Sequence, residues 1–455
     1  MLSYNIMINL DYLITGARII DPESGADFYG AAAVAGDKIA ALYPGDAPAV
    51  KAARVIDAAG GLLVPGFIDP HAHTDNSQAC AEKLLAMGVT SAYSGNCGMS
   101  PPDLGAFFAG FEERGYPVNQ AEQAGQSTLR RAAGQEDAYA PASPAQIRKM
   151  KDLAREAFDA GAAGLSFGLE YNPGTEPEEL RALADCAFAA GKAVSIHARA
   201  STPEASILEA LELCRGGGRV IISHLVYMYS GDGLKRVLEL IAGYRARGAD
   251  VWADSGMYTA FSTLAGSAVF DKVNFARNNF NVNLILAATG KYAGQYLDTK
   301  KFQDILEHFP GDSLIYDLGG PEDVLTAYSL PEVMVSTDCM GYPPGQGHPQ
   351  GAATYPLFFR SLVKEGAGLS LLDALRRCTS IPAKALGYTD RGRVAPGAYA
   401  DLVVLDWERL RERADFPNRG DPGAAPEGVR HVFVNGQLAV EDERRVPGVL
   451  AGRRL

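Results

Sequence analysis

Four of the seven histidines in this 455-residue chain come at or just after the ends of short apolar runs. His71 and His73 stand two apart in FIDPHAHTDN, while His197 ends KAVSIH and His224 follows GRVIIS. Side chains two apart on an extended backbone point the same way, roughly 6.5 Å apart along the chain. Each histidine alone also suits an ordinary hydrogen-bonded position in the core. Together they indicate imidazoles that converge on a metal ion.

An aspartate and a cysteine occur in similar positions. Asp338 closes the apolar run EVMVSTD, and a carboxylate there is costly unless it is paired, hydrogen-bonded or metal-bound. Its alternative role, a helix N-cap, is weakened by the loop sequence GYPPGQG that follows. Cys97 lies in SGNCGMSP, where a buried inert thiol is the alternative to a thiolate ligand.

The chemistry that such a donor set supplies is activation of water. Zinc bound by imidazole, thiolate and carboxylate lowers the pKa of its water to about 7. We therefore predict a Zn²⁺ centre of one or two ions, with Mn²⁺ or Fe²⁺ as alternative ions. Its predicted ligands are His71, His73, Cys97, His197, His224 and Asp338.

The elements that carry these residues indicate an α/β protein. Apolar strand-like runs alternate with helical stretches, such as 144–161 and 203–216, which is typical of a parallel sheet wrapped by helices. We predict a (β/α)8 TIM-like barrel, in which active sites lie at the carboxyl ends of the strands. The expected strands are 62–69, 88–95, 162–170, 192–198, 218–225, 249–255, 282–289 and 332–338.

Both ends of the chain have a different pattern, with short β-type runs separated by turns. We expect residues 1–61 and 388–455 to form one small β-sandwich domain outside the barrel. The catalytic barrel would span residues 62–387. Its stretch 256–331 is too long for a simple crossover and predicts an insertion.

Composition excludes several classes of protein. The net charge is -12, from 54 acidic and 42 basic residues, and the basic residues are scattered, so nucleic acid is not an expected partner. No run of 18 apolar residues occurs, and the start MLSYNIMINLDYLITG lacks the pattern of a signal peptide, so we expect a cytoplasmic protein without a membrane partner. The six cysteines form no CxxC pair and indicate no disulfide framework. Whether the chain forms a homo-oligomer stays open.

Taken together, the motifs resemble the amidohydrolase superfamily, and within it the D-aminoacylase (N-acyl-D-amino-acid deacylase) family. The similar segments are PGFIDPHAH, GVTSAYSGNCGMSP, GLEYNPG, the segments around His197 and His224, STDCM, TSIPAKALGYTDRGRVAPGAYADLVVLD and VFVNG. The resemblance implies a metal-dependent hydrolase that cleaves the carbon–nitrogen bond of a small-molecule amide. It also implies that Cys97, His197 and His224 bind zinc. Asp338 would be both a ligand and the catalytic group that moves a proton from water to the leaving nitrogen.

The sequence departs from that family where a substrate carboxylate would be bound. The family typically has a Lys two residues after the equivalent of His224 and an Arg after the late HP pair, and here these are Val226 and Gln350. Losing two cations removes the contacts that fix a carboxylate. We expect a neutral, cyclic or larger substrate, unless Arg199, Lys291 or Arg360 anchors a carboxylate. Candidate substrate-binding residues are Tyr171, Arg199 and His348.

Two alternatives remain. The first is hydrolysis of a cyclic amide, as in hydantoinases, or deamination of a ring. Hydantoinase-like sites usually have a carboxylated lysine on strand four, and VSIHARA, expected as that strand, has no lysine at its end. The second is a non-catalytic scaffold barrel, which the full set of ligand types disfavours.

Overall fold

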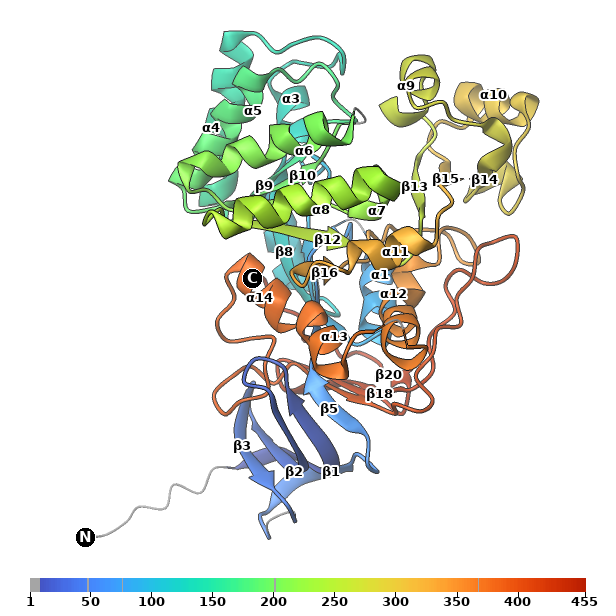
Figure 1. Cartoon of the computed structure of the whole chain (residues 1–455). Coiled ribbons are helices and arrows are strands. Elements are labelled where there is room, and N and C mark those ends of the chain that lie inside the picture. Colours follow the sequence, from blue (N-terminus) through green and yellow to red (C-terminus); the bar gives the residue numbers. More distant parts are fainter. Residues whose placement is uncertain (1–8, 47–48, 76, 200–201, 367) are drawn as a thin grey trace.

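A nearly closed barrel of eight parallel strands forms the centre of the molecule (Figure 1). The computed structural model describes residues 9–46, 49–75, 77–199, 202–366 and 368–455. The barrel strands in spatial order are β6 (Phe67–Asp69), β7 (Val89–Ser94), β8 (Asn119–Gly125), β9 (Gly164–Gly168), β10 (Ala193–His197), β11 (Val220–Ile222), β12 (Val251–Ser255) and β16 (Val333–Val335). The barrel, with a separate sheet of terminal strands, confirms the predicted fold class.

The first and last strands meet just beyond their carboxyl ends. Ala72 and Cys339 form an isolated parallel bridge there. The amide of Asp338 donates to the carbonyl of His71 at 2.8 Å, and the amide of His73 donates to the carbonyl of Cys339 at 2.9 Å. This seam is therefore built from the backbone of three residues that we predicted as metal ligands.

One barrel strand was missed and one predicted barrel strand was wrong. The third barrel strand is β8, whose sequence NQAEQAG has none of the apolar character that predicts a buried strand. Its polar side chains are buried because they bond one another and their neighbours: Gln120 donates to Glu122 at 3.1 Å, and Gln123 donates to Asn96 at 2.8 Å. Residues 282–289, expected in the barrel, instead include β14 (Ile285–Ala287) of another sheet. His197 and His224 consequently follow the fifth and sixth strands, rather than the fourth and fifth.

Helices pack around the barrel, and their starts follow ordinary capping rules. α4 (Pro144–Asp159) begins after Ser143, which forms a capping box with Gln146, and it buries Ile147, Met150, Ala154 and Phe158 on one face. The other helices of this layer and the barrel rim are α1 (Gln78–Ala86), α2 (Leu104–Arg114), α3 (Gln126–Ala132), α5 (Pro177–Ala189), α6 (Pro203–Leu211), α7 (Leu225–Met228), α8 (Gly231–Ala246), α11 (Glu322–Ala327), α12 (Gln350–Phe359), α13 (Leu371–Cys378) and α14 (Ser380–Leu386). None of the helices in the described part of the chain is long and apolar enough to cross a membrane.

The two ends of the chain share a nine-stranded sheet, in which the blue and red strands of Figure 1 lie together below the barrel. Its strands are β1 (Leu10–Asp21), β2 (Ala26–Ala35), β3 (Lys38–Pro44), β4 (Ala52–Asp57), β5 (Leu62–Pro65), β17 (Leu402–Leu405), β18 (Val429–Val434), β19 (Gln437–Glu441) and β20 (Arg444–Arg445). Because β5 pairs with β1 and β17, the expected barrel strand 62–69 is split between the two sheets. Residues 1–8, the start of the predicted β-domain, lie outside the described residues.

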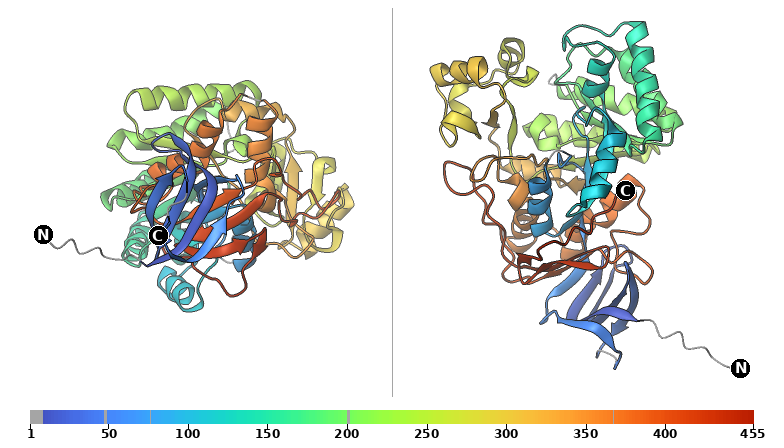
Figure 2. Two further views of the ribbon diagram at one scale, coloured as in Figure 1. Left: turned by 90° about the horizontal axis from the view of Figure 1, so that it is seen from below. Right: turned by 180° about the vertical axis from the view of Figure 1, so that it is seen from behind.

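A second, smaller sheet projects from one side of the barrel, as Figures 1 and 2 show in yellow. It contains β13 (Ala260–Leu264), β15 (Ser313–Asp317) and β14, accompanied by α9 (Lys272–Arg277) and α10 (Thr299–His308). We call residues 260–317 the inserted subdomain. It has its own apolar core, which includes Phe270, Ile305 and Leu314.

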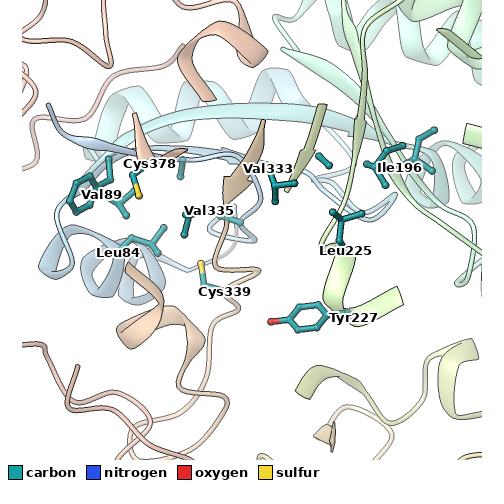
Figure 3. Packing of buried hydrophobic residues seen from close by; sticks show 14 of the residues in the cluster. Leu84, Val89, Ile196, Leu225, Tyr227, Val333, Val335, Cys339 and Cys378 are labelled. Atoms are coloured by element: carbon teal, nitrogen blue, oxygen red, sulfur yellow. The ribbon is translucent and has the colours of Figure 1, made fainter. Parts of the chain in front are cut away.

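The largest apolar core lies between the barrel strands and the surrounding helices. Figure 3 shows Val333 and Val335 of β16 in this core with Leu84 of α1 and Val89 of β7. All four side chains are fully buried. Such packing holds the strand ends in fixed positions, which a site assembled from several strands requires.

Candidate metal centre

The six predicted ligands lie together at the carboxyl end of the barrel. They follow five different strands: β6, β7, β10, β11 and β16. Five of them are buried, and His73 is half-buried. Because each strand is fixed by the barrel, the residues do not depend on a flexible loop for their position.

Their donor atoms form two groups that share one sulfur. The first group is His71, His73, Cys97 and Asp338, and the second is Cys97, His197 and His224, with the donor atoms of each group within 4.8 Å of one another. Cys97 Sγ lies 3.3 Å from His71 Nε2 and 3.5 Å from His224 Nε2. Asp338 Oδ1 lies 3.2 Å from His73 Nε2 and 3.4 Å from His71 Nε2. The thiol therefore stands between two possible ion positions.

Three of these residues have a left-handed backbone, which is uncommon outside glycine. The φ angles are 55° at Cys97, 34° at His224 and 48° at Asp338. Such conformations cost roughly 1–3 kcal/mol each and persist only where the surroundings impose them. Close packing contributes at Cys97, because a Cβ at Gly168 would lie 2.1 Å from the Cys97 carbonyl oxygen. Three of the eight described non-glycine residues with a positive φ thus lie where the donor atoms converge.

Gln350 stabilises the backbone at Asp338. Its side-chain amide donates to the Asp338 carbonyl at 2.5 Å, and its own carbonyl oxygen accepts from the Tyr227 hydroxyl at 2.7 Å. The amide of Asp338 is already bonded to His71 across the seam. Gln350 thus has a structural role here.

The charged groups of the cluster stabilise one another. Burial alone disfavours every charged form, but hydrogen bonds to Asp338 and Cys97 raise the pKa of His73 to about 10. Against the same effect of burial, the charges of His71 and His197 hold the pKa of Cys97 well below its usual range. Hydrogen bonds from His71 and His73 likewise lower the pKa of Asp338. The surroundings therefore favour thiolate and carboxylate beside positive charge.

These residues fit a divalent metal. Imidazole nitrogen, thiolate sulfur and carboxylate oxygen are the donors that zinc prefers, and the other first-row ions accept them as well. The Nδ1 atoms of His71, His197 and His224 are buried without a hydrogen-bond partner among the described residues, while Nε2 of His71 and Nε2 of His224 face the Cys97 sulfur.

A cavity of about 820 Å³, including its open mouth, lies above the cluster. We call its lower wall the floor, which consists of His73, Cys97, His197, His224 and Asp338. The inserted subdomain covers it with four apolar side chains that we call the roof, Phe261, Leu264, Val269 and Phe280. Ser262, Thr263, Ser267 and Asn278 of the same subdomain add polar groups to the lining. Met99, Met228 and Met340 add to the apolar surface. No lysine or arginine is among the described residues that line this cavity.

Two tyrosines also line the cavity. Tyr171 follows the fourth strand, with its ring 4.9 Å from that of His197 and its hydroxyl 3.2 Å from Thr263 Oγ1 of the inserted subdomain. Tyr227 lies 5.5 Å from the His224 ring, measured between centroids. Sequence reasoning selected Tyr171 and missed Tyr227, whose place one turn beyond His224 carried no motif.

The structure does not bring Arg199 and His348 to the lining of this cavity. Arg199 is bonded to Glu209 at 2.9 Å and to the carbonyls of Pro173 and Thr175. His348 is buried with its ring 5.0 Å from that of Tyr258 and 4.9 Å from that of Phe416. Arg199 thus stabilises the loop that contains Pro173 and Thr175, and His348 packs against two aromatic rings.

The other two cations considered from the sequence also have carboxylate partners of their own. Lys291 is paired with Asp304 at 3.0 Å, and Arg360 donates to Glu412 at 2.9 Å. Neither lines the cavity. None of the three cations considered as substitutes therefore faces the donor cluster.

Asp254 is a site-adjacent residue that sequence reasoning missed. It lies near the end of β12 and is completely buried, with Oδ1 bonded to the His224 amide at 2.9 Å. The signal was present, because ADVWADS places a carboxylate at the end of an apolar run, as EVMVSTD does.

The comparisons with known proteins agree with the geometry. The sequence profile of the amidohydrolase family matches residues 54–217 and 333–440. The chain belongs to the amidohydrolase family, and its likeness to the D-aminoacylases is confirmed.

Among its relatives is the N-acyl-D-glutamate deacylase of Alcaligenes xylosoxydans xylosoxydans, 30% identical over 94% of this chain and 93% of that protein. The D-aminoacylase of the same organism is 30% identical over 98% of this chain and 97% of its own length. Of the solved structures, the N-acyl-D-glutamate deacylase of Bordetella bronchiseptica, complexed with zinc and a phosphonate mimic of the tetrahedral intermediate, superimposes with a TM-score of 0.84 at 26% identity. That match covers 98% of this chain and 99% of the other.

The corrected strand order bears on the hydantoinase-like alternative. The fourth strand is β9, and the residues that follow it are Leu169, Glu170 and Tyr171 rather than the segment around His197. No lysine stands at the end of this strand either. Among the described residues, the group shared by both sets of donors is the Cys97 thiol.

Proposed function

We propose that this amidohydrolase uses zinc to cleave the amide bond of a small, neutral N-acyl compound. The observation that carries the proposal is the convergence of two donor groups on the buried Cys97 sulfur, at the base of an apolar cavity. We assign His71, His73, Cys97 and Asp338 to one ion and Cys97, His197 and His224 to the other. The zinc in the structure of the related deacylase supports the choice of ion.

Zinc bound there would lower the pKa of water and polarise the substrate carbonyl. The remaining steps belong to side chains. Asp338 directs Oδ1 toward His71 and His73, so we assign Oδ2 to take the proton of the attacking water. The same oxygen then returns the proton to the leaving nitrogen, because an amide anion is a very poor leaving group. The Tyr171 hydroxyl, at the cavity wall, would contact the substrate.

A neutral substrate is supported by what surrounds the cluster. A carboxylate buried against Phe, Leu, Val and Met side chains needs a cation or several donors, or it costs several kcal/mol. No lysine or arginine is found among the described lining residues, and Arg199, Lys291 and Arg360 are each bound to their own carboxylates. Apolar groups on both sides of the amide would instead bury well in this cavity.

The proposal is tested with a panel of N-acyl-D-amino acids, their carboxamides, N-acyl amines and cyclic imides. Each is incubated with protein reloaded with Zn²⁺, Mn²⁺ or Fe²⁺ after chelation, and product formation is followed by liquid chromatography. We expect hydrolysis of linear amides without a free carboxylate, highest with Zn²⁺ and absent after chelation.

Other outcomes identify the alternatives. Turnover confined to cyclic imides, or release of ammonia from a ring, would favour the hydantoinase-like or deaminase activity. A marked preference for free N-acyl-D-amino acids would contradict the neutral substrate while leaving amide hydrolysis intact. Protein that retains no divalent ion and gains no activity on adding one would overturn the enzyme in favour of a scaffold barrel.

A further inference from the structure

The carboxylate of Asp254 lies between residues of three different barrel strands. Its Oδ1 accepts from the backbone amide of His224 at 2.9 Å and from Ser336 Oγ at 2.6 Å. Its Oδ2 lies 3.5 Å from His71 Nδ1. Both side chains are completely buried, so water does not compete for these contacts. One carboxylate thus connects the first, sixth and eighth strands with the seventh, which carries it.

The orientation of the His71 ring brings its Nδ1 atom toward Asp254 Oδ2. Its Nε2 faces Cys97 Sγ at 3.3 Å and Asp338 Oδ1 at 3.4 Å, so its Nδ1 points away from the cluster. Nδ1 and Asp254 Oδ2 are both buried, and neither has a hydrogen-bond partner among the described residues. Unpaired buried polar atoms are costly, and these two face each other. If the two atoms moved slightly closer, the Nδ1–H group of His71 would donate a hydrogen bond to Asp254 Oδ2, and both atoms would have a partner.

We propose that Asp254 is the positioning residue of the metal centre, which fixes the ring and the tautomer of His71 through Nδ1 and the backbone of His224 through its amide. The inference rests on the proposed function. A histidine that binds a metal through one nitrogen commonly donates its other N–H to a carboxylate, which fixes the tautomer and makes the ligand more basic. His197 and His224 also have buried Nδ1 atoms, but of these three Nδ1 atoms only that of His71 lies beside a carboxylate oxygen of a described residue.

The second contact serves a different ligand. His224 has a φ of 34°, a strained conformation for a residue with a side chain. The hydrogen bond from its amide to Asp254 Oδ1 is one of the contacts that hold this conformation. Asp254 therefore acts on both donor groups, on one through a side chain and on the other through the backbone.

These two roles can be separated by substitution. An amide in Asp254→Asn still presents an oxygen to the His224 amide and the Ser336 hydroxyl, but it presents an NH₂ group to His71, where an acceptor is needed. Asp254→Ala removes both contacts. Asp250→Asn is the matched control, because it makes the same change just before the other end of β12, where Asp250 pairs with Arg219 at 2.9 Å.

The measurement is metal affinity, by competition with a chromogenic chelator for Zn²⁺ and by the absorption of the Co²⁺-loaded protein. We expect Asp254→Asn to weaken binding at the His71 group about 10–100-fold while the thiolate–Co²⁺ band of the His224 group persists. Asp254→Ala should weaken both groups, and Asp250→Asn neither. Thermal unfolding of the metal-free variants shows whether they are folded.

A double-mutant cycle excludes a merely structural role. In a His71→Ala background, Asp254→Asn should change metal affinity less than twofold, because the partner through which it acts is gone. An equal loss in both backgrounds, or unchanged affinity for Asp254→Asn alone, would overturn the inference and leave the proposed function standing. If the unmodified protein binds no ion at either group, both fall together.

Discussion

The floor and the roof of the cavity differ in almost every physical property. The floor is a cluster of ionisable side chains at the ends of packed strands, several of them with strained backbone. The roof is apolar and belongs to the inserted subdomain, which has a core of its own. The family profile covers His73, Cys97, His197 and Asp338 of the floor, and none of the four roof residues lies within its matched ranges. If the proposed function holds, reaction chemistry and substrate choice belong to separately built parts of the chain.

The strongest test of this division is at the floor. Asp338→Asn keeps an oxygen at the ligand position but removes the group that carries the proton. We expect turnover to fall about 10²–10⁴-fold on the best substrate of the panel, with metal content nearly unchanged. Steady-state kinetics and metal analysis on the same preparation check both. Near-normal turnover would show that another group moves the proton.

Both donor groups of the floor depend on the Cys97 sulfur. Cys97→Ala removes a donor from both groups, so we expect Zn²⁺ affinity to fall by at least about 100-fold, more than for loss of an outer partner. Equilibrium dialysis followed by metal analysis measures it. Cys186→Ala, on α5 outside the barrel mouth, is the matched control and should keep its metal. Equal metal contents in the two variants would refute the thiolate ligand.

The buried His348, which contacts the backbone of Ala260 at the start of the inserted subdomain, should respond to acid. Burial lowers the pKa of His348 to about 3, against the smaller opposing effects of the Ala260 backbone and Asp338. Its pKa in the unfolded chain is about 6.5, so its contribution to stability is complete above pH 6.5 and is lost as the pH falls toward 3. Between pH 6.5 and pH 5 this amounts to roughly 2 kcal/mol.

The comparison is between the unmodified protein and His348→Asn, whose side-chain oxygen can still accept from the Gln350 amide, as His348 Nδ1 does at 3.1 Å. Urea unfolding at pH 7 and pH 5 gives the free energy of unfolding of each. The variant should lose less stability than the unmodified protein over this range. Identical losses would show that acid acts on other groups.

The smallest expected effect is at the roof, and it concerns selectivity. Leu264 lines the cavity and is 40% exposed, so replacing it should disturb the fold little. Leu264→Arg places a cation there and should improve kcat/KM for an N-acyl amino acid relative to its carboxamide by about tenfold, the effect of one solvent-screened charged hydrogen bond. Leu264→Gln is the uncharged control. A ratio that stays the same in both variants would contradict the assignment of selectivity to the roof.

Much of this division could be predicted from the sequence, because metal-binding residue types are rare and stand at the ends of apolar runs. The same rule predicts where Asp338 and His197 lie. It fails for β8, whose polar side chains bond one another inside the barrel, and periodicity cannot distinguish such a strand from a loop. In the prediction, residues 282–289 of the inserted subdomain took the place of β8, so the number of predicted barrel strands was still eight.

Contacts between distant segments could not be predicted in this way. Nothing local indicates that Gln350 bonds to the Asp338 carbonyl, or that Arg199 is used by Glu209 and two backbone carbonyls. The sequence shows which side chains are present, whereas their partners depend on the packing of whole elements. For that reason the donor residues were easier to predict than the residues that orient them.

The seam between β6 and β16 has a consequence for the order in which the protein matures. The donors Cys97, His197 and His224 are all synthesised by residue 224, whereas the group with His71 and His73 lacks its carboxylate until residue 338 arrives. The backbone bonds that close the barrel are made by these same residues. A chain still emerging from the ribosome can therefore assemble one donor group early, and the other only when the last strand docks and the barrel closes.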